Sequence, residues 1–336
     1  MQQAAVKAVE QESARTQVDE LAENQTRQET ACLLCRASLE KCVGDLFDTR
    51  FGIPGTFEAW RCLNCGLEQI YPAPTSAELG RLYESYYNFG GERGTSYTRL
   101  REWFFSSWLY RAWIFLDGDI SFHGREGAGR LLDAGCNEGR GLKIYARNGF
   151  RVEGLELNPT AAAVAREGGF TVHVGDTTDF TASEAYDVVV LSNVLEHAPD
   201  PRKVLNNVRE NLNRGGQLWI SCPNSRSWLR KLFGRSWINW HVPFHISHFS
   251  AESLSRLLVE AGFQTVETRQ ITPALWVTQS CIARMFAKEG AKNKQLRNPF
   301  LTLALMVFSR FVLFPLLWLG NRMGRGDCLL VVATKA

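Results

Sequence analysis

The sequence lacks a strong net charge. Its 336 residues include 38 lysines and arginines and 35 aspartates and glutamates, which leaves a formal net charge of +3. A protein whose main partner is a nucleic acid usually carries a marked basic excess. The small charge therefore argues against nucleic acid as a partner.

The first thirty residues lack the continuous apolar run of a secretory signal peptide. They are rich in Gln, Glu and Thr and contain few large apolar side chains. Such a segment cannot bury enough apolar surface to offset the conformational entropy lost on ordering. We expect residues 1–30 to be a disordered tail.

The sequence also lacks an even set of cysteines, because it has nine. An odd number argues against a disulfide framework. Together with the absent signal peptide, this composition is typical of a reducing compartment. We therefore expect a cytoplasmic protein.

Four of the cysteines form two Cys-x-x-Cys pairs with 26 residues between them: Cys32, Cys35, Cys62 and Cys65. Four thiolates at this spacing can hold one tetrahedral zinc ion, and four sulfur ligands leave no open position for catalysis. Gly66 follows the second pair, where the tight turn of a zinc knuckle often needs a positive φ. We predict a structural zinc ribbon over residues 31–72, with Cys42 outside the ligand set.

Strands and helices alternate from residue 130 onwards. Apolar runs such as RLLDAG, RVEGLEL and YDVVVLSN alternate with helical stretches of about 10–15 residues. This alternation predicts βαβ units on a parallel sheet. We expect a Rossmann-like α/β core formed by residues 129–271 and 326–336, a helical cap or linker over 73–128, and an apolar helical insertion over 272–325.

Polar residues follow four of the predicted strands. The first strand ends in DAGCNEGRG, whose glycines let a ligand approach the backbone at a helix N-terminus. The second ends at Glu156, 23 residues after Asp133, where a carboxylate can accept both hydroxyls of a ribose. The third ends at Asp176 and the fourth in SNVLEH, residues 192–197. Because such ends meet at one edge of a parallel sheet, we expect a ligand site there.

The motifs LLDAGCNEGR, GLELNP, GDTTDF, YDVVVLSNVLEHAPDP and LNRGGQLWISCPN resemble those of the class I S-adenosylmethionine-dependent methyltransferases. The order of ribbon, YPAP turn, tyrosine-rich helix and core resembles a bacterial subgroup associated with glycan or small-molecule modification. The resemblance implies a mostly parallel sheet whose last strand runs antiparallel between strands five and six. It also implies that S-adenosylmethionine places its methionine end at Asp133, Gly135 and Gly139, its ribose at Glu156 and its adenine at Asp176.

Two positions depart from this resemblance. Asn137 stands where the family usually has glycine, but asparagine tolerates the left-handed conformation, so we expect the loop to keep its shape and to bind the cofactor. Asn193 stands where ubiquinone O-methyltransferases have a glutamate thought to hold a divalent cation with the following Glu-His pair. One carboxylate and one imidazole make a poor site for a hard cation, so we expect Asn193 to be a cofactor contact and no metal-assisted catalysis.

Histidines in two segments are candidates for the base that a hydroxyl or amine acceptor requires. His197 follows the fourth strand, and residues 241–248 carry three more, of which we choose His245. A purely structural role for Glu196 and His197 stays open, as does a metal held by the three histidines of 241–248. Three nearby tryptophans could stack on a sugar or quinone ring or act as interfacial anchors: Trp228, Trp237 and Trp240.

The helix expected over residues 251–262 begins after Ser250, a favourable N-cap residue. Its capping box is expected to be incomplete, because Ser253 stands where a glutamate or glutamine would close it.

Residues 300–320 (FLTLALMVFSRFVLFPLLWLG) form a long apolar stretch that contains Arg310 and Pro315. A single membrane span would leave the following strand, DCLLVVATK, on the far side of the bilayer from its sheet. We expect two short helices joined near Arg310, either lying in one membrane leaflet or buried against the core or a second subunit. Basic residues on both flanks favour an anionic membrane surface, which the aromatic helix over 103–116 would share.

These features predict methyl transfer from S-adenosylmethionine to an amphiphilic or lipid-linked acceptor, a glycan or a quinone-like molecule, at the inner face of the cell membrane. One alternative is a soluble O- or C-methyltransferase acting on a sugar nucleotide or a secondary metabolite. Another is a zinc-ribbon interaction protein with a vestigial cofactor fold, against which the intact Asp133, Glu156 and Asp176 argue. The acceptor's identity and the oligomeric state stay open.

Overall fold

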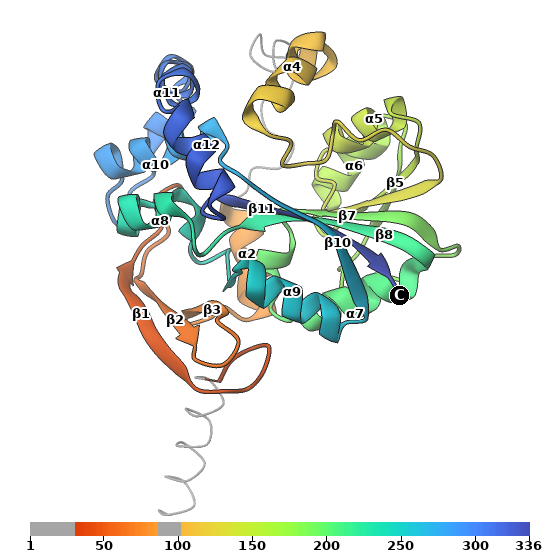
Figure 1. Ribbon diagram of the computed structural model, residues 1–336, viewed down its shortest axis with the longest axis horizontal. Coiled ribbons are helices and arrows are strands. Elements are labelled where there is room, and N and C mark those ends of the chain that lie inside the picture. The colour runs from red at the N-terminus through yellow and green to blue at the C-terminus, as the bar shows by residue number, and fades with distance from the viewer. Residues whose placement is uncertain (1–30, 87–101) are drawn as a thin grey trace, which may run out of the picture.

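The computed structural model describes residues 31–86 and 102–336 (Figure 1). The tail predicted over residues 1–30 and part of the predicted cap lie outside the described residues. The strands are β1 (Leu39–Leu46), β2 (Phe57–Cys62), β3 (Glu68–Tyr71), β4 (Arg130–Ala134), β5 (Arg151–Glu156), β6 (Thr171–Val174), β7 (Tyr186–Ser192), β8 (Leu212–Pro223), β9 (Ser247–His248), β10 (Phe263–Ile271) and β11 (Cys328–Lys335). The helices are α2 (Ser76–Tyr86), α4 (Trp108–Asp117), α5 (Arg140–Arg147), α6 (Pro159–Glu167), α7 (Pro201–Asn211), α8 (Trp228–Phe233), α9 (Ala251–Glu260), α10 (Ala274–Phe286), α11 (Pro299–Phe311) and α12 (Phe314–Arg322), with short 3₁₀ turns η1 (Leu195–His197), η2 (Gly234–Ser236), η3 (Ile238–Trp240) and η4 (Lys294–Arg297).

The larger sheet has seven strands in the order β10-β11-β8-β7-β4-β5-β6. The neighbouring pairs among β8, β7, β4, β5 and β6 are all parallel. Strand β11 lies between β8 and β10 and is antiparallel to both. This arrangement confirms the predicted α/β fold and the place of its antiparallel last strand.

Helices cover both faces of this sheet (Figure 1). Successive side chains of a strand point to opposite faces, so β7 contributes to two cores. Val189 and Leu191 join the apolar cluster that includes α7 and α9, whereas Val188 and Val190 join the cluster that includes Tyr145 of α5. A central strand buried on both faces explains why YDVVVLS is a continuous apolar run instead of an alternating one.

The ribbon forms a second sheet in the order β1-β2-β3-β9. Strand β9 comes from the histidine segment, residues 241–248, and pairs antiparallel with β3, so that His248 lies opposite Glu68. Cys62, Cys65 and Leu67 belong to the same apolar cluster as the sheet and α7. The ribbon is thus packed into the core, and sequence analysis did not predict this pairing.

Helix α9 begins at a complete capping box, so the prediction of an incomplete one is wrong. The Ser250 hydroxyl accepts a hydrogen bond from the Ser253 backbone N–H at 3.2 Å, and the Ser253 hydroxyl accepts one from the Ser250 backbone N–H at 2.9 Å. The short serine side chain reaches the cap backbone here as a glutamate would.

The apolar insertion folds into α10, α11 and α12. Helices α11 and α12 are bent by 64° at a break two residues after Arg310, as predicted for two short helices. Among the described residues no single helix has the length and apolar character needed to cross a bilayer, and only this bent pair meets both criteria when taken together.

Candidate functional site

Two neighbouring cavities lie at the carboxyl ends of the parallel strands. The first, of about 690 Å³, lies between the loop after β4 and helices α4 and α10. The second, of about 760 Å³, lies between the ends of β5, β6 and β7 on one side and α2 and the histidine segment on the other. Gly135, Asn137, Asn193 and Trp276 line both cavities, so the two meet at the end of β4.

The loop after β4 has the tight shape that its glycines predict. Gly135 and Gly139 have φ values of 82° and 79°, and Asn137 adopts the expected left-handed conformation at φ 50°. A side chain at Gly135 would approach Val194 to 2.7 Å. Gly135 and Asn137 line the cavities, whereas Gly139 packs against Ala165 of α6 and shapes the loop from behind.

Asp133 lies at the end of β4, where its carboxylate lines the first cavity although only 6% of the residue is exposed. Burial and, to a smaller extent, the nearby carboxylate of Glu156 raise the pKa of this carboxyl to about 7. A positively charged ligand group, such as the ammonium of an amino acid, would offset both effects.

Glu156 ends β5 and holds the backbone of two loops. Its carboxylate accepts hydrogen bonds from the backbone N–H groups of Asn137 at 2.8 Å and Asn158 at 2.9 Å. Each oxygen keeps a second lone pair, so the group can still accept the two hydroxyls of a ribose. Burial raises its pKa above the usual range, although these hydrogen bonds lower it.

Asp176 and Asn193 lie where the sequence placed them, at the ends of β6 and β7. Asp176 lines the second cavity and accepts a hydrogen bond from the Thr178 backbone N–H at 2.8 Å. Asn193 has a left-handed φ of 53° and lines both cavities. The structure therefore brings the predicted cofactor residues around one continuous space, with Gly139 behind it.

Both predicted histidines line the second cavity. The rings of His197 and His245 meet edge to face with centroids 4.5 Å apart. The Nδ1 atom of His197 lies 2.9 Å from the Tyr83 hydroxyl of α2, and the Nδ1 atom of His245 lies 2.8 Å from the Asn239 carbonyl oxygen. Burial lowers the pKa of His197 to about 4 and places that of His245 well below its usual range. Both imidazoles are therefore neutral at pH 7 and are weak proton acceptors.

The predicted tryptophans do not form an acceptor site. Trp237 and Trp240 are 0% and 2% exposed, lie in an apolar cluster and are absent from the linings of both cavities. The Trp237 indole donates to the buried Asp327 carboxylate at 2.8 Å, and Trp228 packs against Gly320 of α12. Besides histidines, the aromatic residues that line the second cavity are Trp276 of α10 and Tyr83 of α2. Sequence analysis missed these two because only the fold brings their helices to the strand ends.

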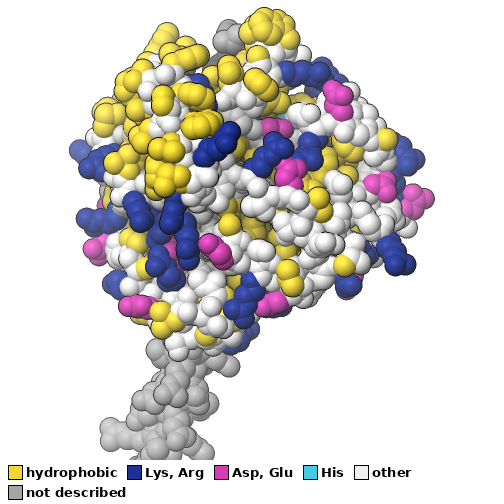
Figure 2. Space-filling model, in the orientation of Figure 1, with side chains coloured by type: hydrophobic (Ala, Val, Ile, Leu, Met, Phe, Trp, Pro, Cys, Tyr) yellow, Lys and Arg dark blue, Asp and Glu magenta, His cyan; other side chains and the backbone are white. Residues whose placement is uncertain are grey.

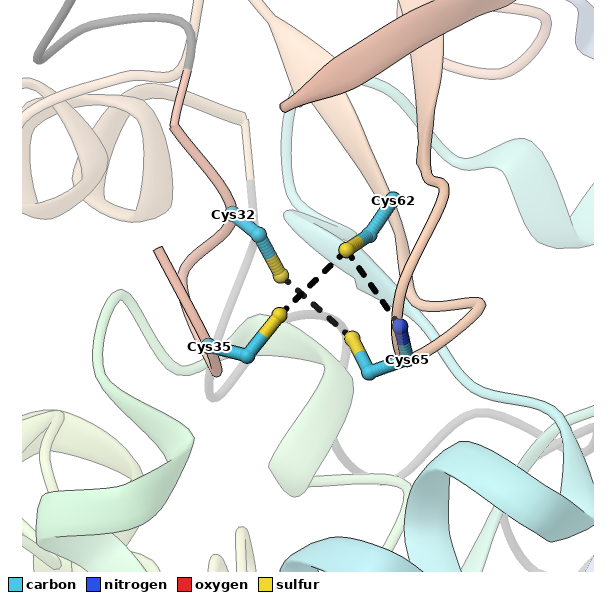
Figure 3. Close-up of side chains that lie close together, drawn as sticks. All are labelled: Cys32, Cys35, Cys62 and Cys65. Carbon is cyan, nitrogen blue, oxygen red and sulfur yellow. Dashed lines mark hydrogen bonds between the residues drawn. The ribbon is translucent and has the colours of Figure 1, made fainter. Parts of the chain in front are cut away.

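The four predicted zinc ligands converge on one point (Figure 3). The Sγ atoms of Cys32 and Cys65 are 3.5 Å apart, and those of Cys35 and Cys62 are 3.4 Å apart. These separations are too long for disulfide bonds and near the value of about 3.8 Å that a tetrahedral site with 2.3 Å zinc–sulfur bonds requires.

The two cysteine pairs have the same backbone geometry. In each, the first cysteine accepts a backbone hydrogen bond from the residue four positions on, Arg36 or Gly66. These two residues have φ values of 58° and 73°, as predicted for Gly66. Cys42 lies apart from the four and donates to the Ala59 carbonyl oxygen. The cluster therefore fits a closed tetrahedral metal.

An apolar surface lies over α4, α11 and α12 (Figure 2). Its most exposed members are Phe115, Phe300, Trp108, Phe311, Leu303 and Val312. Exposed basic residues border it on α10, on the loop after α10, on η4 and on α12: Arg284, Lys288, Lys292, Lys294, Arg297 and Arg322. Helices α4 and α11 also reach the first cavity. Trp113 and Ile114 of α4 and Met306 of α11 line it.

Known proteins resemble the core of this chain. Residues 111–268 match the family model described as a methyltransferase domain. The chain is 35% identical over 124 residues to the ubiquinone biosynthesis O-methyltransferase of Cronobacter sakazakii and 33% identical over 124 residues to that of Klebsiella pneumoniae. Each alignment covers 34% of this chain and 51% of the relative, so the chain spans about half the length of the curated relatives it matches.

Solved structures are similar at lower identity. A possible histamine N-methyltransferase from Thermotoga maritima is 18% identical with a TM-score of 0.44, and the alignment covers 71% of this chain and 96% of that one. The [4+2]-cyclase SpnF is 16% identical with a TM-score of 0.48, covering 78% and 97%. The segment matched by the methyltransferase-domain model runs from α4 into β10 and includes Asp133, Glu156, Asp176 and Asn193, so this similarity covers the residues at the strand ends.

Proposed function

We propose that this protein transfers the methyl group of S-adenosylmethionine to an oxygen atom of an amphiphilic or lipid-linked acceptor, glycan or quinone-like, at the inner face of the cell membrane. The observation that carries the proposal is the continuous space at the strand ends. It has buried carboxylates at Asp133 and Glu156 and reaches the apolar helices α4 and α11. The names of the relatives, ubiquinone biosynthesis O-methyltransferases, support an oxygen acceptor.

The cofactor is assigned to this space by the charges and hydrogen-bond acceptors around it. The ammonium of its methionine part would lie near Asp133, its ribose hydroxyls near Glu156 and its adenine near Asp176. The methyl group would then lie near Asn193, where the two cavities meet. Methyl transfer needs the acceptor oxygen in line with the carbon–sulfur bond at near-attack distance, so an acceptor bound beside His197 and Trp276 would meet this condition.

The apolar surface supports an acceptor that is itself partly apolar. Exposed contiguous apolar patches on soluble proteins commonly mark interaction sites, and a basic border favours an anionic lipid surface. Because α4 and α11 contribute to both the surface and the first cavity, an acceptor held at a membrane would approach the methyl group between these helices.

The ribbon is assigned a structural zinc ion. Four converging sulfurs leave no open coordination position, so the metal would stabilise the fold without taking part in catalysis. The zinc would support the candidate site indirectly, because strand β3 of the ribbon pairs with β9 of the histidine segment.

The test is methyl transfer into a native extract. The full chain is incubated with S-adenosylmethionine labelled in the methyl group and with either the lipid extract or the aqueous extract of its source cells. Label that enters the organic phase with the lipid extract, and is lost with Asp133→Asn, is the expected result. Label found only with the aqueous extract would reject the amphiphilic acceptor, and no transfer from either would reject the activity.

A further inference from the structure

We propose that Glu196, His197 and His245 form a second metal site, for a divalent transition-metal cation, at the floor of the second cavity. One ligand atom from each of these side chains lies within 4.8 Å of the other two. His197 and His245 line the cavity, and Glu196 lies beneath them with 1% of its surface exposed. The site is separate from the four-cysteine cluster of the ribbon.

Glu196 is the first sign that something is bound here. Both of its carboxylate oxygens are buried and have no hydrogen-bond partner within the described part of the chain. Leaving a buried carboxylate without a partner costs several kcal/mol, so native proteins rarely do so. A cation between the carboxylate and the two imidazoles would remove this cost.

The two histidines are already oriented as metal ligands. A metal-bound histidine usually donates its second ring N–H to an oxygen atom, which fixes the tautomer and the ring orientation. The Nδ1 atom of His245 donates to the carbonyl oxygen of Asn239 at 2.8 Å, which leaves the lone pair on Nε2, where the Nδ1 atom of His241 lies at 3.3 Å and a cation would take its place. The Nδ1 atom of His197 lies 2.9 Å from the Tyr83 hydroxyl, which can accept from it or donate to it, and the ring also bonds to the backbone of Phe244. Both rings are neutral at pH 7, as ligands must be.

Two imidazoles and one carboxylate favour zinc, manganese or iron over magnesium or calcium, which prefer oxygen ligands throughout. The third ligand comes from the histidine segment and not from position 193, where the sequence has asparagine. Its place is held by backbone bonds: the Ile246 N–H donates to the Glu196 carbonyl oxygen at 2.8 Å, and the Ile70 N–H of the ribbon donates to the Ile246 carbonyl oxygen at 3.0 Å. The ribbon thus supports the site.

The consequence for chemistry rests on the proposed function. A cation at this place would bind the hydroxyl oxygen of the acceptor and lower its pKa, so that the oxygen loses its proton more readily for methyl transfer. Arg50 lies close enough to lower the pKa of both histidines and opposes a cation here. The ionised Glu196 supplies the compensating negative charge.

The test uses Co²⁺ as the probe on the full chain with zinc already in the ribbon. The wild-type protein should bind one further Co²⁺ per chain and show weak visible bands without the intense absorption of cobalt–thiolate bonds. Glu196→Gln and His245→Asn should each weaken this binding by about 100-fold or more, because each removes a ligand. The control is His248→Asn, which removes a buried histidine of the same segment that is outside the ligand set.

Three results would overturn the site: no second equivalent of Co²⁺ in the wild-type protein, unchanged binding in Glu196→Gln, or thiolate absorption showing that the cobalt entered the ribbon. Binding of S-adenosylhomocysteine and the melting temperature report whether each variant is folded. The wild-type titration decides the matter even where a variant fails to fold. Cobalt binding needs no methyl transfer, so failure of this site and failure of the proposed activity give different results.

Discussion

At the scale of single residues, the candidate site contains two buried carboxylates, and one of them holds the backbone of two loops through hydrogen bonds. Glu156 fixes the left-handed Asn137 through a backbone hydrogen bond, and Asp133 lies on the neighbouring strand and lines the adjoining cavity. Burial raises the pKa of both groups. The free protein therefore holds unfavourable charge at the place where a cationic ligand would bind, which is a usual property of functional sites.

Asp133 gives the site a pH dependence. The pKa of this carboxyl is about 7 in the free protein, and a bound ammonium group would lower it. Below pH 7 the ligand must displace a proton, so affinity for S-adenosylhomocysteine should rise about tenfold from pH 6 to pH 8. Calorimetric titration at both pH values checks this. Asp133→Asn should abolish the difference, and an equally large one in that variant would place the titrating group elsewhere.

Sequence reasoning worked for residues whose role depends on local backbone. The positive φ of Gly66, the tolerance of Asn137 for the left-handed region and the N-cap at Ser250 all follow from neighbouring residues. Sequence reasoning failed for Trp237 and Trp240. These side chains are buried by residues far away in the chain, among them Asp327, which accepts a hydrogen bond from Trp237, and apolar residues of the ribbon strands, so neighbouring residues do not reveal the burial.

At the scale of elements, one buried ion pair explains the charge in the apolar stretch. Arg310 of α11 donates to the Asp117 carboxylate at the end of α4 at 3.1 Å, and both side chains are under 10% exposed. The same carboxylate oxygen accepts from the backbone N–H of Ala274 at the start of α10. Arg310 therefore joins three helices around the first cavity.

Replacing Arg310 by leucine should destabilise the protein although it makes the stretch more apolar. The change leaves the Asp117 carboxylate buried without its cation, which costs about 3–5 kcal/mol. The free energy of unfolding, measured in urea, checks this. Asp117→Asn added to Arg310→Leu should recover part of the loss, and a single variant as stable as wild type would show that the pair contributes nothing.

The ribbon is the second element that joins distant parts of the chain. Metal analysis should find one zinc in the four-cysteine cluster, and Cys62→Ser with Cys65→Ser should lose it and unfold the ribbon, because such folds depend on their metal. Hydrogen exchange should then increase in the histidine segment as well, since β9 pairs with β3. Cys42→Ser is the matched control and should keep its zinc. A folded ribbon without metal would contradict the assignment.

The seven strands of the main sheet could be predicted because apolar runs such as those of β7 and β11 stand out and because the segments between them alternate regularly with helical stretches. Strand β9 could not, because two residues, Ser247 and His248, carry no strand pattern of their own. Its pairing depends on the ribbon lying beside the core. The histidine segment was accordingly recognised as chemically important without the contacts that orient it.

At the scale of the whole molecule, several of the predicted cofactor residues line the first cavity together with helices α4 and α11 of the apolar surface. If that surface binds lipid, serine at three exposed positions should weaken binding to vesicles of phosphatidylcholine and phosphatidylglycerol by about tenfold or more, because each apolar side chain contributes to burial. The positions are Phe300, Leu303 and Phe311, which are 84%, 62% and 66% exposed. Co-sedimentation with the vesicles measures the effect.

The control has serine at three apolar positions of similar exposure away from this surface: Leu63, Val259 and Val266. It should bind vesicles as the wild-type protein does. Equal binding by both triple variants, or none by the wild-type protein, would reject the membrane surface and favour contact with another subunit.

The joining of ribbon, core and insertion into one molecule was the part least accessible from sequence. Each segment was recognised by its own pattern, but β9, Asp117 and Arg310 connect them through contacts between residues far apart in the chain. Such contacts depend on the completed fold, so no local pattern predicts them.

The central claim is that the strand ends bind S-adenosylmethionine, and one calorimetric titration tests it most directly. The wild-type chain should bind one S-adenosylhomocysteine, and Glu156→Ala should lose about 1.5–3 kcal/mol of binding free energy, roughly 10- to 150-fold in affinity, because a charged acceptor for the ribose is gone. Melting curves establish that the variant is folded. No binding by the wild-type chain, or equal affinity in the folded variant, would contradict the account.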